Sequence, residues 1–172
     1  MAPRILFVCT GNICRSPMAE LLLRHRLRDH PDAVSVSSAG VAAMVDHPIH
    51  PLAADVLGEH GVESGDFRAR YLTPAHLTEA DLVLTMAREH RDAATSKAPM
   101  RWRRIAVLRE FDEAIADGGA DVSAPRFTGD RNRPALDIED PMGRPREEFE
   151  RVATELDPLI DRLATWVLSL RD

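Results

Sequence analysis

Residues 8–17 read VCTGNICRSP and begin at the last residue of the apolar run 5–8. In this stretch Cys9 and Arg15 enclose five residues, and a loop of that length can wrap a dianion the size of a phosphate group. Arg15 offers a planar fork that matches two phosphoryl oxygens. The same positive surroundings favour the thiolate form of Cys9, which is a nucleophile. The stretch therefore predicts an anion-binding loop with a reactive cysteine at its start.

The residues on either side predict a strand before this loop and a helix after it. Residues 5–8 are β-branched, aromatic and aliphatic, which is typical of a buried strand, and Ser16-Pro17 is typical of a helix start. Gly11 and Asn12 tolerate the left-handed backbone that a tight cradle needs. Ser16 is placed to donate a hydrogen bond to the thiolate. The alternative, a cysteine packed at a strand end with an arginine in a surface ion pair, does not explain this combined context.

Apolar runs alternate with helix-like segments along the whole chain. We expect strands at residues 5–8, 34–36, 82–85 and 105–108, and helices at residues 17–28, 51–60 and 88–94, with a turn near 74–77. A closing helix is expected from the apolar positions between Phe149 and Leu170, with a kink at Pro158. Residues 108–137 show no regular pattern and are expected to form a surface loop.

This alternation predicts an α/β fold, with residues 1–172 forming a single doubly wound domain. Its four-stranded parallel sheet would be flanked by helices on both faces. Such sheets bind ligands beyond the carboxyl ends of their strands, and the loop that starts at Cys9 follows the first strand. The fold therefore places this loop where a ligand site is expected.

Composition narrows the classes of function. The chain has 22 Lys and Arg against 28 Asp and Glu, a net charge of −6, which disfavours general nucleic-acid binding. No apolar run approaches the length of about 18 residues that a membrane span needs, and we see no secretory signal pattern at Met1, so we expect a cytoplasmic protein. The only cysteines are Cys9 and Cys14, so neither a disulfide framework nor a structural zinc site is expected.

Segments outside the loop extend the pattern. They are SSAG at 37–40, RAR at 68–70 with LT at 72–73, ADLVLTM at 80–86 and DIEDP at 137–141. With these segments the chain resembles the low-molecular-weight protein tyrosine phosphatases, of a bacterial, actinobacterial-like kind, over about residues 4–170. The resemblance implies hydrolysis of phosphotyrosine through a phosphocysteine intermediate, without a metal or cofactor. It also implies that Asp140 is the general acid.

By its residues alone, Asp140-Pro141 fits a turn as well as it fits a catalytic acid. The resemblance decides in favour of the acid, and the nearby carboxylates Asp137 and Glu139 are the lesser candidates. The catalytic residues are therefore expected to be Cys9, Arg15 and Asp140.

The remaining site residues follow from the loop and from the resemblance. We expect the substrate to contact the loop residues Thr10, Gly11, Asn12, Ile13, Cys14 and Ser16, with Met44 and Met142 at the rim. Ser38, by resemblance, would join Asn12 in bracing the loop. The family often has an aromatic residue where Met142 stands, another in the segment of Met44, and a histidine where Phe67 stands. These departures weaken an aromatic wall around the substrate ring and leave the phosphoryl chemistry intact.

Three other functions remain open for this sequence. An arsenate reductase needs further cysteines for its thiol relay, which the chain lacks. A phosphoarginine phosphatase typically has Thr where Ile13 stands. A non-catalytic phosphoprotein-binding module would not need the full set of Cys9, Arg15 and Asp140. We expect a phosphorylated protein as substrate, phosphate or a similar oxyanion in the loop, no nucleic-acid or membrane partner, and a monomer or weak dimer.

The two cysteines lie on one tight loop, so their sulfurs can come within bonding reach. A reactive Cys9 oxidises readily to the sulfenic acid, and Cys14 could then trap it as a reversible disulfide. The alternative is that Cys14 is only a small buried residue. The sequence thus predicts redox sensitivity.

Overall fold

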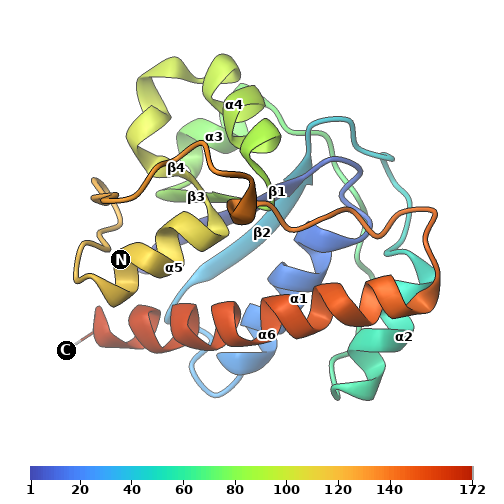
Figure 1. The fold of residues 1–172 in the computed structure, drawn as a ribbon. Coiled ribbons are helices and arrows are strands. Elements are labelled where there is room, and N and C mark those ends of the chain that lie inside the picture. The colour runs from blue at the N-terminus through green and yellow to red at the C-terminus, as the bar shows by residue number, and fades with distance from the viewer. Residues whose placement is uncertain (172) are drawn as a thin grey trace.

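A four-stranded parallel sheet forms the centre of the computed structural model, which describes residues 1–171 (Figure 1). Its strands are β1 (Arg4–Cys9), β2 (Ser35–Gly40), β3 (Leu82–Thr85) and β4 (Ile105–Val107), in the order β2-β1-β3-β4. Each neighbouring pair is parallel. The predicted four-stranded parallel sheet is confirmed.

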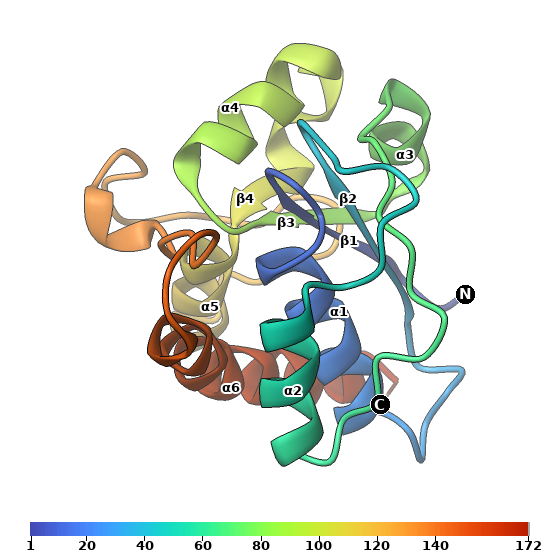
Figure 2. The ribbon, with the colours of Figure 1, turned by 90° about the vertical axis from the view of Figure 1, so that its right-hand side faces the viewer.

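Helices cover both faces of this sheet (Figure 2). On one face lie α1 (Arg15–Arg26), α2 (Pro51–Glu59), α5 (Leu108–Ala116) and α6 (Arg146–Ser169). On the other lie α3 (Pro74–Glu79) and α4 (Arg88–Lys97). Two short 3₁₀ helices, η1 (Pro99–Arg104) and η2 (Pro134–Leu136), complete the set. Of the helices within residues 1–171, none is both long enough and apolar enough to cross a membrane.

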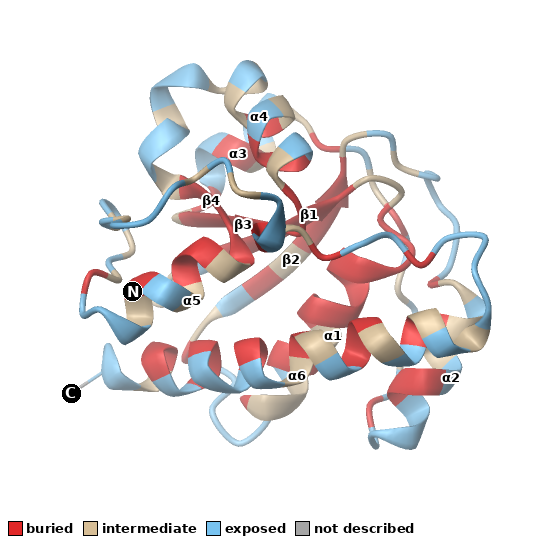
Figure 3. Cartoon of the chain, in the orientation of Figure 1, coloured by how far each residue is buried: buried red, intermediate tan, exposed pale blue. Residues whose placement is uncertain are grey.

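The side chains of β1 alternate between two hydrophobic cores, because successive residues of a strand point to opposite faces. Ile5 and Phe7 belong to the larger core, which lies under α1, α2, α5 and α6. Leu6 and Val8 belong to the smaller core on the side of α3 and α4. Figure 3 shows that the sheet is mostly buried, apart from the first part of β2, and that α6 is buried along its inner face only. The central strand is therefore held rigidly from both sides.

The second strand differs from its predicted bounds. It was expected at residues 34–36, yet β2 pairs with β1 residue by residue from Ser35 to Gly40. The apolar pattern ends early because this strand is made of serine, alanine and glycine beyond Val36. Backbone pairing with β1, which a hydropathy pattern does not report, extends it.

Residues 108–137 are not wholly irregular, so this part of the prediction was wrong. Helix α5 begins immediately after β4 and buries Leu108, Phe111 and Ala114 at helical spacing. No Ser, Thr, Asp or Asn marks its start. Instead the carboxylate of Glu110 accepts a hydrogen bond of 2.7 Å from the backbone N–H of Val107. Residues 74–79 likewise form a short helix rather than a turn, and α6 continues through Pro158.

The sheet order places the loop after β1 at a topological switch point. From β1 the chain crosses to β2 on one side and then to β3 on the other. The carboxyl end of β1 is therefore flanked by connections that leave in opposite directions, which opens a crevice for a ligand.

Candidate active site

The loop after β1 turns its backbone carbonyls outward. Four of them accept hydrogen bonds of 2.8–3.0 Å from N–H groups in residues 41–50; the carbonyls are those of Cys9, Thr10, Gly11 and Ile13, and the donors are Val41, Ala42, Met44 and His50. All peptide bonds here are trans, so each following N–H points the opposite way. The N–H groups of residues 10, 11, 12 and 14 therefore face inward and form an anion cradle.

Asn12 holds this loop in shape. Its backbone is left-handed, with φ at 56°, as the sequence predicted. Its Nδ2 donates to Ser16 Oγ at 2.8 Å and to Ser38 Oγ at 2.9 Å, while its Oδ1 accepts from the backbone N–H of Arg70 at 2.9 Å. Gly11 does not use the left-handed region that its residue type allows. The bracing of the loop by Asn12 and Ser38 is present as expected.

The brace continues to a buried carboxylate on α1 that the sequence analysis missed. Ser38 Oγ donates to Glu20 Oε2 at 2.5 Å, and Arg24 pairs with Glu20 Oε1 at 2.8 Å. Burial raises the pKa of Glu20 above its ordinary value. Phe67, where the family often has histidine, offers no hydrogen-bonding group. Helical periodicity alone places Glu20 on the inner face of α1, which is the one signal that could have found it.

Gly40 at the end of β2 lets the loop approach closely. A Cβ there would overlap the carbonyl oxygen of Thr10 and lie 3.0 Å from the backbone nitrogen of Asn12. Both neighbours are backbone atoms of the cradle and cannot rotate away. The glycine is therefore required by space.

We expect Gly40→Ala to lower kcat/KM for an aryl phosphate about tenfold or more, because overpacking displaces the cradle. The kinetics are measured beside thermal unfolding. Gly58→Ala, in the last turn of α2 with nothing within 4 Å of its added Cβ, is the matched control and retains activity. Wild-type kinetics for Gly40→Ala would show that the loop tolerates the shift.

Cys9 is buried at the foot of the loop, 2% exposed, and its Sγ lies 2.9 Å from Ser16 Oγ. Ser16 is thus placed to donate to a thiolate, as expected. Helix α1 begins at Arg15, where the loop that starts at Cys9 ends, so the positive end of the helix dipole adjoins this loop. Cys14 is different: burial, reinforced by the charge of Cys9, raises its pKa to about 12. Cys14 therefore remains a thiol at neutral pH.

Arg15 is 3% exposed and held by two groups. Its Nη1 donates to the carbonyl of Ile138 at 2.8 Å, and its Nη2 donates to Thr10 Oγ1 at 3.4 Å. Within residues 1–171 its buried Nε has no hydrogen-bond partner. A held guanidinium with a spare N–H beside the cradle is suited to an oxyanion.

Asp140 reaches the same place from the far end of the chain. Its Oδ2 lies 3.5 Å from Arg15 Nη2, and its side chain is 47% exposed. Its Oδ1 accepts a hydrogen bond of 3.1 Å from the N–H of Met142. The sequence alone left two interpretations of Asp140 open, a turn residue and a catalytic acid. In the structure Asp140 accepts a hydrogen bond from the residue two positions later and also lies beside Arg15.

The lesser acid candidates lie elsewhere. Asp137 accepts hydrogen bonds from the backbone N–H of Arg88 at 2.8 Å and from its Nη2 at 2.9 Å. Burial acts to raise the pKa of Asp137, but the bonds from Arg88 hold it below its ordinary value. Asp137 is therefore committed to Arg88, and it does not line the pocket that Cys9 and Arg15 share. Glu139 is not among the residues that line the pocket.

A pocket of about 200 Å³ joins these groups. Its walls are Cys9, Thr10, Gly11, Ile13, Cys14, Arg15, Ala42, Met44, Asp140 and Met142. Met44 and Met142 are 37% and 44% exposed, which places them at the rim as expected. Asn12 and Ser16, expected to contact substrate, are fully buried and not in the wall. Their side chains brace the loop from behind instead.

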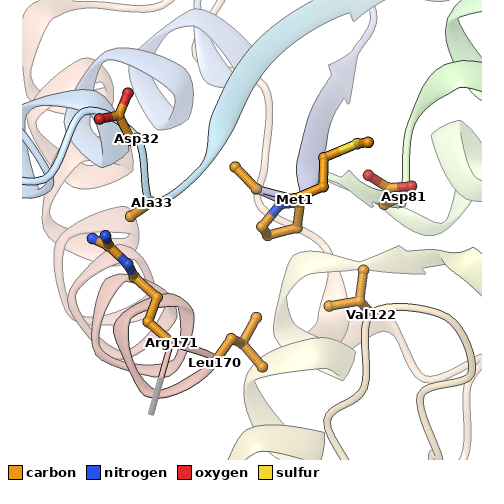
Figure 4. Close-up of a pocket in the computed structure, with 9 residues that line it drawn as sticks. Met1, Asp32, Ala33, Asp81, Val122, Leu170 and Arg171 are labelled. Atoms are coloured by element: carbon orange, nitrogen blue, oxygen red, sulfur yellow. The ribbon is translucent and has the colours of Figure 1, made fainter.

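A larger cavity of about 640 Å³ lies at the opposite ends of the strands (Figure 4). Met1, Asp32 and Asp81 line it, and each precedes a strand. Within residues 1–171 its lining includes no cysteine, serine or histidine. Of these two pockets, the smaller one is the one lined by cysteine and arginine of the loop after β1.

Comparison with known proteins agrees with this geometry. The family model described as low molecular weight phosphotyrosine protein phosphatase matches residues 4–133. Low molecular weight protein-tyrosine phosphatase A of Mycobacterium bovis is 36% identical over 166 residues, covering 95% of this chain and 90% of the relative. The protein-arginine-phosphatase of Geobacillus stearothermophilus is 37% identical over 164 residues, covering 95% of each.

A solved structure extends the match to the fold. The tyrosine phosphatase Wzb from Escherichia coli K30, in complex with sulphate, is 30% identical with a TM-score of 0.74, covering 96% of this chain and 98% of that one. Family model, full-length relatives and fold all agree. The chain belongs to the low molecular weight phosphotyrosine protein phosphatase family.

Proposed function

We propose that this phosphatase hydrolyses phosphotyrosine, as an aryl phosphate monoester, with Cys9 as nucleophile and Asp140 as general acid. One observation carries the proposal. Cys9, Arg15 and Asp140 line a single pocket, in which Asp140 lies 3.5 Å from Arg15. A nucleophile, a dianion cradle and a proton donor are thereby within reach of one phosphoryl group.

In the first step the Cys9 thiolate attacks phosphorus. A sulfur–phosphorus bond forms as the bond from phosphorus to the aryl oxygen breaks, and the departing oxygen takes the proton of Asp140. Arg15 and the inward N–H groups bind the phosphoryl oxygens while charge develops on them. The products of this step are the free phenol, a phosphocysteine and an ionised Asp140.

In the second step water attacks the phosphocysteine. The Asp140 carboxylate takes a proton from that water, the sulfur–phosphorus bond breaks, and inorganic phosphate leaves. Ser16, 2.9 Å from the sulfur, stabilises the departing thiolate by donating its hydroxyl proton in a hydrogen bond. Asp140 is then protonated again and ready for the next substrate.

The depth of the pocket supports an aryl substrate. The sulfur of Cys9 is buried below a rim formed by Met44 and Met142. A tyrosine side chain is long and flat enough to carry its phosphate to that depth, whereas serine is short. Ile13 in the wall offers apolar surface to a ring, and flexible methionines can contact rings as well.

A second candidate substrate is phosphoarginine. The observation in its favour is the arginine phosphatase relative, which matches 95% of this chain at 37% identity. Against it stands Ile13, since phosphoarginine phosphatases typically have Thr at this position. The branched apolar side chain leaves no hydroxyl for a guanidinium substrate.

We expect the wild type to hydrolyse a phosphotyrosine peptide with a kcat/KM at least about tenfold above that for matched phosphoserine and phosphoarginine peptides, a difference of about 1.4 kcal/mol. Ile13→Thr is expected to narrow the gap to phosphoarginine, while Ile49→Val, a core change outside the pocket wall, leaves the ratio unchanged. Phosphate release from the three peptides is measured in parallel. Faster turnover of phosphoarginine by the wild type would establish the second candidate.

We propose further that residues 1–172 act as one cytoplasmic domain on phosphorylated proteins, as a monomer or weak dimer. In support, the cysteine loop and the acid loop come from opposite ends of the chain. Helix α6 also packs in the core shared with α1.

We also propose that Cys14 protects Cys9 from irreversible oxidation. Both line the pocket, and a sulfenic acid on Cys9 can condense with the Cys14 thiol to a disulfide and water. Because the pKa of Cys14 is raised to about 12, the condensation is expected to quicken as pH rises. After peroxide and then dithiothreitol, the wild type is expected to recover more activity than Cys14→Ala. Equal recovery would mean that Cys14 is only a buried small residue.

A further inference from the structure

His90 is a buried histidine beside the cysteine loop that the mechanism above does not use. It is the third residue of α4 and is fully buried. Its Nε2 lies 2.9 Å from Thr10 Oγ1, while its Nδ1 is buried without a hydrogen-bond partner within residues 1–171. A half-satisfied ring costs stability in a place where an apolar residue would not. Such a residue at an active site calls for a functional reason.

The ring is neutral at neutral pH. Burial, reinforced by the charge of Arg15, lowers the pKa of His90 to about 4, against smaller opposing effects of Asp140 and Asp137. The carboxylate of Glu89, whose own side chain is exposed, lies 3.5 Å from Nε2. A neutral imidazole keeps one nitrogen with a free lone pair.

The Thr10 hydroxyl connects this ring to the catalytic arginine. Arg15 can only donate, so Thr10 Oγ1 accepts from its Nη2 at 3.4 Å. Nε2 of a neutral His90 meets the same hydroxyl, accepting its proton in one tautomer and donating to its second lone pair in the other. In either tautomer the Thr10 hydroxyl is held between Arg15 and His90.

We propose that His90 is a positioning residue that orients the Arg15 guanidinium through the hydroxyl of Thr10. The carbonyl of Ile138 holds Nη1 at 2.8 Å, and the hydroxyl fixed by His90 holds Nη2. With both held, the guanidinium plane is set before an oxyanion arrives, and the entropy of ordering it is not lost on binding. The inference rests on the proposed roles of Cys9 and Arg15.

Two substitutions at His90 separate hydrogen bonding from packing. His90→Leu removes the partner of Thr10 and keeps an apolar side chain of similar bulk. His90→Gln places an amide within reach of the same hydroxyl. We expect His90→Leu to lower kcat/KM for an aryl phosphate and to weaken vanadate binding about tenfold to a hundredfold, as for a hydrogen bond linked to a charged group. His90→Gln is expected to stay within about threefold of the wild type.

A double-mutant cycle tests the path through Thr10. Thr10→Val removes the hydroxyl and keeps the branched shape. If His90 acts through that hydroxyl, His90→Leu has less than about twofold further effect in the Thr10→Val background. His30→Leu, an exposed histidine outside the pocket, is the matched control for a general effect of losing an imidazole. Circular dichroism and thermal unfolding accompany each variant.

The outcomes are distinct. The proposal is supported if His90→Gln keeps kcat/KM and vanadate affinity near those of the wild type, and if His90→Leu causes no further loss in the Thr10→Val background. Equal losses from His90→Leu in both backgrounds, or a folded His90→Gln as impaired as His90→Leu, overturn it. If His90→Leu does not fold, His90→Asn, too short to reach Thr10, takes its place against His90→Gln. The proposed function fails separately, through an active Cys9→Ser variant, whatever His90 does.

Discussion

Cys9→Ser is expected to abolish hydrolysis of aryl phosphates while leaving oxyanion binding in place. A serine hydroxyl stays protonated near neutral pH and cannot replace a thiolate as nucleophile. The inward N–H groups of the loop and the Arg15 guanidinium remain, so vanadate or phosphate should still bind. Since a catalytic nucleophile is worth several orders of magnitude, residual turnover should fall below about 1% of the wild type. Steady-state hydrolysis and vanadate binding measure the two parts of the result.

Arg15→Lys serves as the companion to this variant. It should lose both turnover and oxyanion affinity, because an ammonium cannot reproduce the fork held by Ile138 and Thr10. Oxyanion binding that is retained in Cys9→Ser and lost in Arg15→Lys distinguishes the role of the nucleophile from that of the anion-binding loop. Turnover above about 1% in Cys9→Ser would show that another group attacks phosphorus.

Asp140→Ala is expected to lower kcat by roughly 10²- to 10⁴-fold on substrates with a basic leaving group, the usual contribution of general acid catalysis. The loss should shrink for nitrophenyl phosphate, because a weakly basic oxygen departs with little need of a proton. The measurement is kcat for a series of aryl phosphates that differ in the basicity of the phenol. The dependence on leaving group is what identifies the acid.

Glu139→Ala is the matched control, an exposed carboxylate next to Asp140 that lies outside the pocket wall. It should behave as the wild type across the series. Asp137→Ala should lower kcat by a similar factor for every leaving group, because it loosens the tie to Arg88 without removing a proton donor. A uniform loss in Asp140→Ala as well would show that Asp140 positions the loop and that the acid lies elsewhere.

The elements that the sequence missed have a common cause. Helix α5 starts on the residue after β4, and the side chain of Glu110 caps its N-terminus. No residue type typical of a helix start therefore marks the boundary between this strand and this helix. The polar half of β2 is a strand only because β1 lies beside it. Hydropathy reports which residues are buried in a typical element. It does not report hydrogen bonds to a strand that is distant in the chain.

The sequence by itself indicated the strand, the anion loop and the helix of residues 4–26, together with Cys9 and Arg15, which we propose as the nucleophile and the oxyanion-binding arginine. Strand, loop and helix are consecutive, so local spacing and residue type are sufficient to specify their chemistry. Only the tertiary structure decided what surrounds them. Asp140 and the carbonyl of Ile138 meet Arg15 across more than 120 residues of chain, and Gly40 and His90 reach the loop from β2 and α4. These contacts depend on the parallel order β2-β1-β3-β4, which brings the carboxyl ends of distant strands to one edge and has no local signature in the chain.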